Sequence, residues 1–322
     1  MKAAFNRSII AFVFLSIILF GCSKSSNLNT SGNLQNSLNL SSDGKHVYGL
    51  LPMTPDQFAN FPLYSKEYFS GTLTQKALTS VPKVVTLWNP AVRDQGQLGS
   101  CTAFCGVESN EILYHYKNGS TTILSPAFIY YCERVLILKE SISADQGAYM
   151  VDIPQALQKY GDCLETSYAY PVSDTSTAYK TAPSTGAMTE GLGYVIGQSQ
   201  TSYAMINAGD TAAVKNILRN NTPVMMGFNV YDIRSNTIFE GLNSTSYTYN
   251  PITKTGSLVS GAKLLGGHAV PIIGYDDTRG VFLCQNSWGT SWGNSGFFLL
   301  PYAVFQSTKI VPSGSVYYAT LN

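Results

Sequence analysis

The sequence predicts an α+β fold in which a helical half precedes a β-rich half. Apolar runs of helical length occupy the chain between residues 101 and 160, whereas short apolar runs separated by glycines dominate from about residue 225. At 322 residues the chain can bury a large core, and roughly 240 residues remain after an N-terminal leader, a normal size for one two-lobed domain. We expect the two halves to form two lobes that meet at a cleft.

Three helices are expected in the first half. Residues 101–117 form an apolar run that Asn118 and Gly119 close, as a glycine C-cap does. Residues 125–139 begin with Pro126 near the first turn, where the missing N–H costs least. Residues 152–160 form the third run.

Strands are expected in the second half at residues 223–230, 269–275, 281–285 and 296–300. The strand at 269–275 is expected to be entered through a glycine turn at Gly266 and Gly267. Residues 172–202 and 232–262 are polar and rich in Ser, Thr and Gly, so we expect surface loops or insertions there.

The N-terminus predicts export. Lys2 and Arg7 precede an apolar run of twelve residues at 9–20, which suits a signal-peptide core and is short for a bilayer span. The run ends in Gly21 and Cys22, which resembles a bacterial lipobox, and Ser23 after it resembles lipoproteins sent to an outer membrane. We expect a protein lipid-anchored through Cys22 in a bacterial cell envelope, at the outer membrane or cell surface. The alternative is an ordinary signal peptide or a short anchor that contains a cysteine.

Four segments are therefore expected: a signal peptide at 1–21, a flexible Ser/Asn-rich tether at 22–43, a segment at 44–80, and the main folded domain at 81–322. The segment at 44–80 carries enough aromatic side chains to pack on something. It is either an N-terminal extension packed on the domain, which we favour, or a short prosegment lying across the cleft.

Composition and motifs exclude several function classes. Charged residues make up 12% of the chain and the net charge is +1, so nothing indicates a nucleic-acid surface. No HExxH and no GxxxxGK[ST] sequence occurs, so zincin and P-loop chemistry have no support. We expect no metal and no organic cofactor.

A cysteine at the start of the first predicted helix is the main candidate nucleophile. Cys101 follows a tight turn at Gly99 and Ser100, and the free N–H groups of a helix's first turn stabilise a thiolate and can hold an oxyanion. A buried, inert thiol is the alternative, since free cysteines are more often small hydrophobes.

The candidate base is His268. His46 lies in the leader region, and His115 stands fourteen residues along the same helix as Cys101, roughly 20 Å away at the helical rise. His268 lies in an apolar β run, where a satisfied core histidine is the alternative. Asn286 can accept the second ring N–H of a histidine and fix its tautomer and plane.

These segments together resemble the papain-like cysteine peptidases, in a form similar to a bacterial branch of the family. In that family Q-G-x-x-G-S-C, G-H-A-V and N-S-W-G-x-x-W-G occur in this order, matching Gln95 to Cys101, Gly267 to Val270 and Asn286 to Gly293. The resemblance covers roughly residues 81–310, including an L-S-x-x-x-L-x-x-C-like run at 124–132. It implies a two-lobed fold and a cysteine-type endopeptidase that hydrolyses peptide or protein substrates through a thioester on Cys101.

The resemblance also implies residue roles. Gln95 would supply the oxyanion hole, and Trp288 would shield the Asn286–His268 bond, although a plain core aromatic is its alternative. Gly147 and Ala148 correspond to a cleft-lining Gly-Gly pair, and Gly267 is a tentative third substrate-binding residue. Two family residues are absent: Leu98 replaces a disulfide cysteine, and Thr102 replaces the tryptophan after the nucleophile.

The other cysteines have implied roles as well. Cys132 occupies a family disulfide position, and a bridge to Cys163 is one possibility in an oxidising compartment. Cys105 and Cys284 are expected to be buried thiols.

Two other functions remain open at this stage. One is a papain-like surface binding module without turnover. The other is a transpeptidase or ligase that passes the same thioester to an amine. In each case we expect a monomer.

Overall fold

The computed structural model describes residues 38–66, 81–171, 180–199, 202–233 and 238–321. The predicted signal peptide, the predicted lipidation residue Cys22 and most of the predicted tether lie outside these residues. Among the described residues, no helix combines the length and apolar character that a membrane crossing requires.

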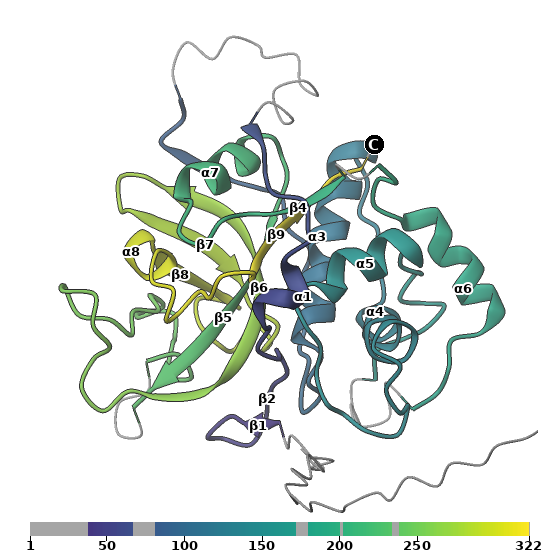
Figure 1. Ribbon diagram of the computed structural model, residues 1–322, viewed down its shortest axis with the longest axis horizontal. Helices are drawn as coiled ribbons and strands as arrows, with labels where there is room; N and C mark the ends of the chain where they lie inside the picture. The colour runs from purple at the N-terminus through teal and green to yellow at the C-terminus, as the bar shows by residue number, and fades with distance from the viewer. Residues whose placement is uncertain (1–37, 67–80, 172–179, 200–201, 234–237, 322) are drawn as a thin grey trace, which may run out of the picture. The chain divides into compact units, whose positions relative to one another are not determined.

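An antiparallel sheet forms the β lobe (Figure 1). Its strand order is β4-β9-β5-β6-β7-β8, and β3 pairs with β6 outside this path. The strands are β3 (Val84–Thr86), β4 (Tyr203–Met205), β5 (Val224–Asp232), β6 (Lys263–Asp276), β7 (Val281–Gln285), β8 (Phe297–Pro301) and β9 (Val316–Ala319). The four predicted strands correspond to β5, β6, β7 and β8.

The strand β6 is longer than predicted because Gly266 and Gly267 lie inside it. They pair with Val230 and Asn229 of β5, and His268 lies opposite Phe228. The expectation of a glycine turn before this strand is therefore wrong. Because Gly267 has no side chain, the backbone of Leu50 can lie close to this strand. A Cβ on Gly267 would lie 2.5 Å from the carbonyl oxygen of Leu50.

The helical lobe is built around α3 (Cys101–Asn118), which ends at Gly119 in the left-handed conformation, φ 67°. This helix is buried from Cys101 to Tyr114 and packs against β6, α4 and α5. The remaining helices are α1 (Pro55–Phe58), α4 (Pro126–Tyr131), the π-helix η1 (Cys132–Ile137), α5 (Asp152–Lys159), α6 (Thr185–Gly191), the 3-10 helix η3 (Leu192–Tyr194), α7 (Thr211–Arg219) and α8 (Tyr302–Phe305).

Two helical predictions need correction. The run at 125–139 changes from α-helix to π-helix at Cys132 and ends at Ile137. The stretch 172–202 is not only loop, because α6 and η3 form within it. Ser184 caps α6 by accepting a hydrogen bond from the Ala187 N–H.

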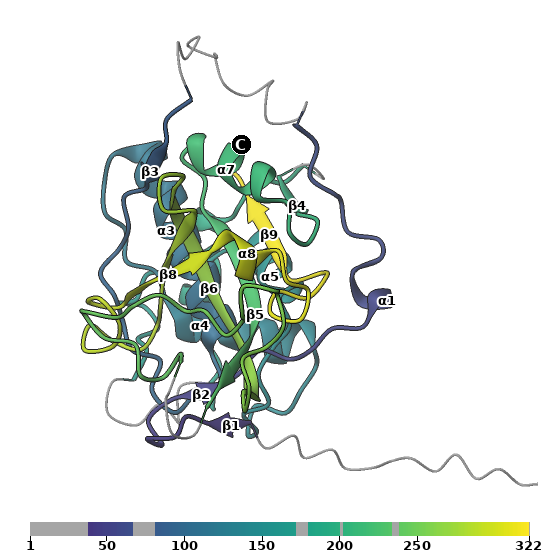
Figure 2. The same ribbon diagram turned by 90° about the vertical axis from the view of Figure 1, so that its left-hand side faces the viewer.

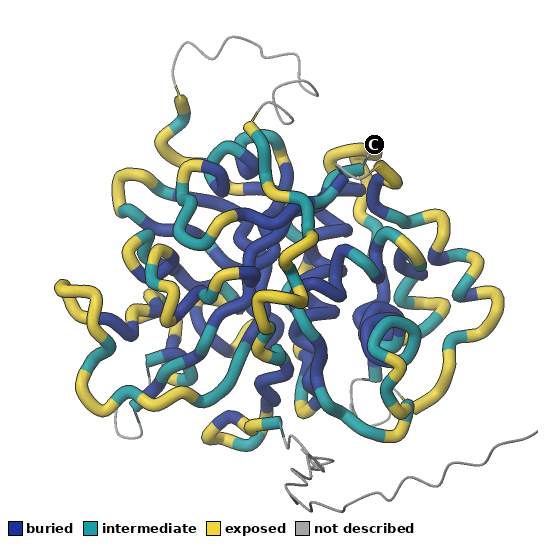
Figure 3. The backbone as a smooth tube through the Cα atoms, in the orientation of Figure 1, coloured by how far each residue is buried: buried dark blue, intermediate teal, exposed yellow. Residues whose placement is uncertain are grey.

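Each lobe has its own hydrophobic core, and the buried chain segments gather where the lobes meet (Figure 3). The sheet core includes Phe228, Phe239 and Trp292, and the helical core includes Phe104, Phe128 and Leu157. The expected α+β, two-lobed architecture is confirmed.

The N-terminal segment forms a short hairpin, β1 (Asn39–Leu40) with β2 (Val47–Tyr48). It lies beside one end of β5 and β6 (Figure 2), where Tyr48 packs against Gly266. The described part of the predicted tether 22–43, residues 38–43, therefore packs on the domain. The reason is that Asn39 donates to Leu265 O and the Ser42 N–H donates to Glu240, which fixes this stretch on the domain.

Candidate active site

Cys101 is the first residue of α3 and is fully buried. Burial raises the pKa of its thiol to about 12, although backbone N–H groups of Gly49 and Ala269 directed at the sulfur oppose this shift. Ala269 follows His268 in β6, so the helix start and this strand meet at the sulfur. The hydroxyl of Ser100, the residue before Cys101, lies 2.8 Å from the Tyr170 hydroxyl and forms a hydrogen bond with it.

His268 and Asn286 form a hydrogen-bonded pair. The Nε2 atom of His268 lies 2.7 Å from Oδ1 of Asn286, which also accepts from the Ser287 N–H at 2.9 Å. An amide oxygen only accepts, so the proton of the neutral imidazole is assigned to Nε2. The other nitrogen, Nδ1, is buried and has no hydrogen-bond partner among the described residues, which leaves it available as a base.

The surroundings of His268 are aromatic. Its ring centroid lies 5.4 Å from Trp288 and 5.8 Å from Phe239. Burial lowers the pKa of His268 to about 4, and the bond to Asn286 opposes this shift. With a raised cysteine pKa and a lowered histidine pKa, the described state holds a neutral thiol and a neutral imidazole at pH 7.

Gln95 lies on a loop that pairs with the loop after Asn286. The Gln95 N–H donates to Ser287 O at 2.9 Å, and the Ser287 hydroxyl donates to Gln95 Oε1 at 2.7 Å. These bonds fix the direction of the side-chain amide. Its Nε2 donates to the carbonyl oxygens of Val47 and Leu98, both at 3.0 Å.

The segment around Gly49 and Leu50 lies against the predicted substrate-binding residues. Leu50 bridges Gly267 in the antiparallel sense and Ala148 in the parallel sense. The Leu50 N–H donates to Gly267 O, the Leu51 N–H donates to Ala148 O, and the Ala148 N–H donates to Gly49 O. Gly147, with φ 76°, approaches so closely that a Cβ there would lie 2.0 Å from the Gly49 oxygen.

The structure describes residues 44–66 of the predicted segment 44–80, and their contacts fit both interpretations of it. Val47 meets the Gln95 amide, Gly49 faces Cys101, and Leu50 joins Gly267 to Ala148. Packing on the domain and covering the cleft are here the same set of contacts.

Thr102 replaces the family tryptophan with a polar contact. Its hydroxyl donates to Oε2 of Glu133 at 2.8 Å, and both residues are fully buried. Burial raises the pKa of Glu133 well above its ordinary value, and the nearby Asp152 carboxylate raises it further.

The possible bridge between Cys132 and Cys163 is not formed: both are free, buried thiols. Burial raises the pKa of both thiols. Since disulfide formation requires a thiolate, burial disfavours a bridge between them. Cys105 and Cys284 are buried thiols, as expected.

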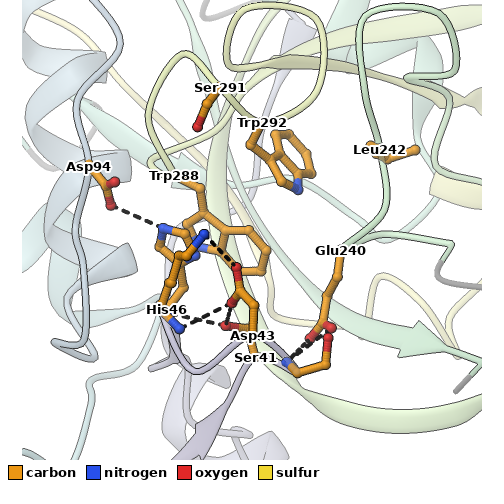
Figure 4. A pocket seen from close by; sticks show the side chains of 11 residues that line it. Ser41, Asp43, His46, Asp94, Glu240, Leu242, Trp288, Ser291 and Trp292 are labelled. Atoms are coloured by element: carbon orange, nitrogen blue, oxygen red, sulfur yellow. Dashed lines mark hydrogen bonds and ion pairs between the residues drawn. The ribbon is translucent and has the colours of Figure 1, made fainter.

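The sequence prediction passed over His46, which belongs to the site region. His46 is buried, its ring stacks on Trp288 at 4.5 Å, and its Nε2 lies 3.1 Å from Oδ1 of Asp94 (Figure 4). Nothing in the local sequence marks this histidine. His115 is correctly excluded, since it stacks on Trp88 at a centroid distance of 3.9 Å, near the far end of α3.

Within the described ranges, no group of three or more His, Cys, Asp or Glu side chains is arranged to hold a metal ion. The candidate nucleophile Cys101 stands at a helix start, the candidate base His268 is oriented by Asn286, and the Gln95 amide is the candidate oxyanion donor.

Comparison with known proteins agrees with this geometry. The family model described as papain family cysteine protease matches residues 86–316. The chain belongs to the papain family of cysteine proteases. The expectation of a hydrolase of the cysteine-peptidase type is confirmed by this membership.

Individual papain-family members are moderately similar. An uncharacterized peptidase C1-like protein of Acanthamoeba polyphaga mimivirus is 32% identical over 238 residues, which cover 68% of this chain and 67% of the relative. Cathepsin B-like CP3 of Giardia intestinalis is 26% identical over 65% of this chain, and this chain spans 63% of that relative's length. The crystal structure of xylellain, a cysteine protease from Xylella fastidiosa, superposes with a TM-score of 0.66 at 28% identity, covering 85% of this chain and 96% of xylellain.

Proposed function

We propose that this papain-family protein is an endopeptidase that hydrolyses peptide bonds through a thioester on Cys101. The observation that carries the proposal is the bond between His268 Nε2 and Asn286 Oδ1, with Nδ1 left unpartnered on the same ring. This pairing orients a base whose free nitrogen can exchange a proton with a thiol.

In the proposed reaction, His268 Nδ1 takes the thiol proton and the Cys101 sulfur attacks the substrate carbonyl carbon. The oxyanion is held by the Gln95 amide and the Cys101 backbone N–H, each contributing on the order of 3 kcal/mol to the transition state. His268 then gives its proton to the leaving amine as the C–N bond breaks. Finally, His268 takes a proton from water, which attacks the thioester and releases a carboxylic acid and the Cys101 thiol.

The described state is the latent form in this proposal. The Val47 carbonyl oxygen accepts a hydrogen bond from the Gln95 amide that would hold the oxyanion. Leu50 forms β-bridges with Gly267 and Ala148, the proposed substrate-binding residues. We therefore assign residues 44–80 as a prosegment that must leave the cleft before substrate enters.

We also propose the anchored location that the sequence indicates. Processing before Cys22 would leave a lipid-bearing N-terminus in a bacterial cell envelope. The peptidase would act there as a monomer on peptide or protein substrates.

The test is an internally quenched peptide assay on the full chain, with products identified by mass spectrometry in the presence of an added amine. A carboxylic acid product supports hydrolysis, and an amide product shows transfer to the amine. Cys101→Ala should abolish turnover and keep the wild-type circular dichroism and melting temperature. Turnover that survives this substitution would refute the proposal.

A further inference from the structure

A cavity of about 290 Å³ lies beside the catalytic pair, between the N-terminal hairpin and the β lobe (Figure 4). The catalytic domain contributes two carboxylates, Asp94 and Glu240, and two indoles, Trp288 and Trp292. The other domain residues that line it, Leu242 and Ser291, are uncharged. The described residues on the domain side of the cavity are thus anionic, aromatic or uncharged, and none of them is a cation.

The N-terminal segment places side chains against the domain side of the cavity. The His46 ring lies parallel to Trp288, with an interplanar angle of 8°, and its Nε2 meets the Asp94 carboxylate at 3.1 Å. Lys45 also lines the cavity. Its Nζ lies 3.5 Å from Asp43 of the same segment, so His46 is the basic residue that contacts a carboxylate of the domain.

Among the described residues, the hydrogen bonds to the Glu240 carboxylate come from the N-terminal segment. The carboxylate accepts hydrogen bonds from the Ser42 N–H, at 3.0 and 3.1 Å, and from the Tyr48 hydroxyl at 2.7 Å. When the segment leaves, these donors leave with it. The Glu240 carboxylate then lacks these donors and remains in a lining that includes the two indoles.

A second, independent feature points to a ligand. Trp292 is more than nine-tenths buried, and its Nε1–H has no hydrogen-bond partner among the described residues. Figure 4 shows this nitrogen on the edge of the ring that faces the space between Trp288 and Glu240. An N–H donor in that place suits a ligand that brings an acceptor, as a peptide carbonyl does.

The cavity lies at one end of the path that the N-terminal segment takes through the cleft. Leu50 marks the other end at Gly267 and Ala148, and Val47 lies between them at the Gln95 amide. Trp288 packs on His268, the residue that would protonate the leaving amine. A chain that departs from that amine would pass Trp288 and enter the cavity.

We propose that this cavity is a specificity subsite for a basic side chain on the leaving-group side of the scissile bond. The inference rests on the proposed peptidase function and deepens it by naming a substrate class. A lysine, arginine or histidine cation would stack on Trp288 and pair with Asp94 or Glu240, and a backbone carbonyl would accept from Trp292. The face of an indole attracts a cation, and each charge-assisted hydrogen bond to a carboxylate adds to this attraction.

The test uses internally quenched peptides that differ only at the first and second residues after the scissile bond, with Lys, Arg, Gln, Leu or Glu in turn. The measured quantity is the ratio of kcat/KM for the Lys peptide to that for the Gln peptide. Because both peptides meet the same active molecules, this ratio is independent of the fraction of enzyme that is still latent. The full-length protein can therefore be used.

We expect a ratio on the order of 10 or more for the wild type, since 1.4 kcal/mol corresponds to a factor of ten. The ratio should fall severalfold in Asp94→Asn and in Glu240→Gln. Glu240→Lys should reverse the order and favour the Glu peptide, which a loss of structure alone would not do. Asp277→Asn, with the same charge change at the Lys215 ion pair, should keep the wild-type ratio.

A wild-type ratio near one would overturn the inference, as would a preference that neither Asp94→Asn nor Glu240→Gln changes. A basic preference found only on the acyl side of the scissile bond would also overturn it. If none of the peptides is cut, even after removal of the N-terminal segment, the proposed function itself fails. That outcome is distinct from cleavage without selectivity.

Discussion

The amide nitrogen of Gln95 lies 3.0 Å from the carbonyl oxygen of Val47. Gln95 is the donor assigned to the oxyanion, so a peptide carbonyl of the chain itself occupies that place. The same segment directs the Gly49 N–H at the Cys101 sulfur. One stretch of backbone thus contacts both the proposed oxyanion donor and the proposed nucleophile, and in our proposal these contacts hold the enzyme inactive.

Gly49→Ala should activate the full chain. A Cβ at Gly49 would lie 2.0 Å from the carbonyl oxygen of Gly99, a backbone atom that cannot move aside cheaply. The methyl group therefore weakens the closed state. We expect peptide turnover and Cys101 alkylation by an epoxide inhibitor to rise on the order of tenfold, which corresponds to a shift of about 1.4 kcal/mol.

Gly193→Ala is the matched control for this experiment, because its added Cβ meets no atom within 4 Å. It should leave turnover and labelling unchanged. Labelling of Cys105 at the same rate as Cys101 would contradict the assignment of the nucleophile. An unchanged Gly49→Ala rate would contradict the assignment of the prosegment.

Replacing the two amides should act mainly on kcat. Gln95→Ala removes an oxyanion donor and should lower kcat by about 10²–10³-fold. Asn286→Ala should lower kcat substantially and leave measurable activity, since this residue positions His268 and does not react itself. Both effects can be measured by pre-steady-state kinetics of peptide cleavage with proteins from which the N-terminal segment has been removed. A wild-type kcat in either variant would show that the assigned geometry is not the reactive one.

Stability should fall as pH rises, in part through Glu108. Burial raises the pKa of Glu108 to about 8, with Arg93 opposing, whereas the unfolded side chain titrates near 4.5. Between these values the folded protein keeps a proton that the unfolded chain loses, so the free energy of unfolding decreases with rising pH. Glu108→Gln lacks this titration. The free energy of unfolding is measured with urea in a Cys101→Ala background. From pH 5 to pH 8, that of the Glu108→Gln variant should rise by about 3 kcal/mol relative to that of its parent. The same pH dependence in both proteins would exclude Glu108 as the source.

Cys22→Ser should separate anchoring from catalysis. If Cys22 carries lipid, the variant should leave the membrane fraction or fail to mature, because a single apolar run of twelve residues is too short to span comfortably. Its peptide turnover per active site should match the wild type. Fractionation that finds the variant tightly membrane-bound would assign the anchor to the apolar run itself.

Local signals in the sequence determined much of this protein. The glycine after Asn118 ends α3, the apolar run at 281–285 is β7 to the residue, and three short motifs identify the candidate nucleophile, base and orienting amide. These features depend on residues close in the chain, so periodicity, caps and motif spacing reveal them.

Only the tertiary structure decided how the N-terminal segment and the cavity are built. His46 meets Asp94 across 48 residues, and Ser42 meets Glu240 across 198. Contacts at such separations leave no periodic pattern and require no special residue type at either end. They exist because folding brings the two lobes and the hairpin together, and that juxtaposition turned a histidine in an apparent leader into a neighbour of the catalytic pair.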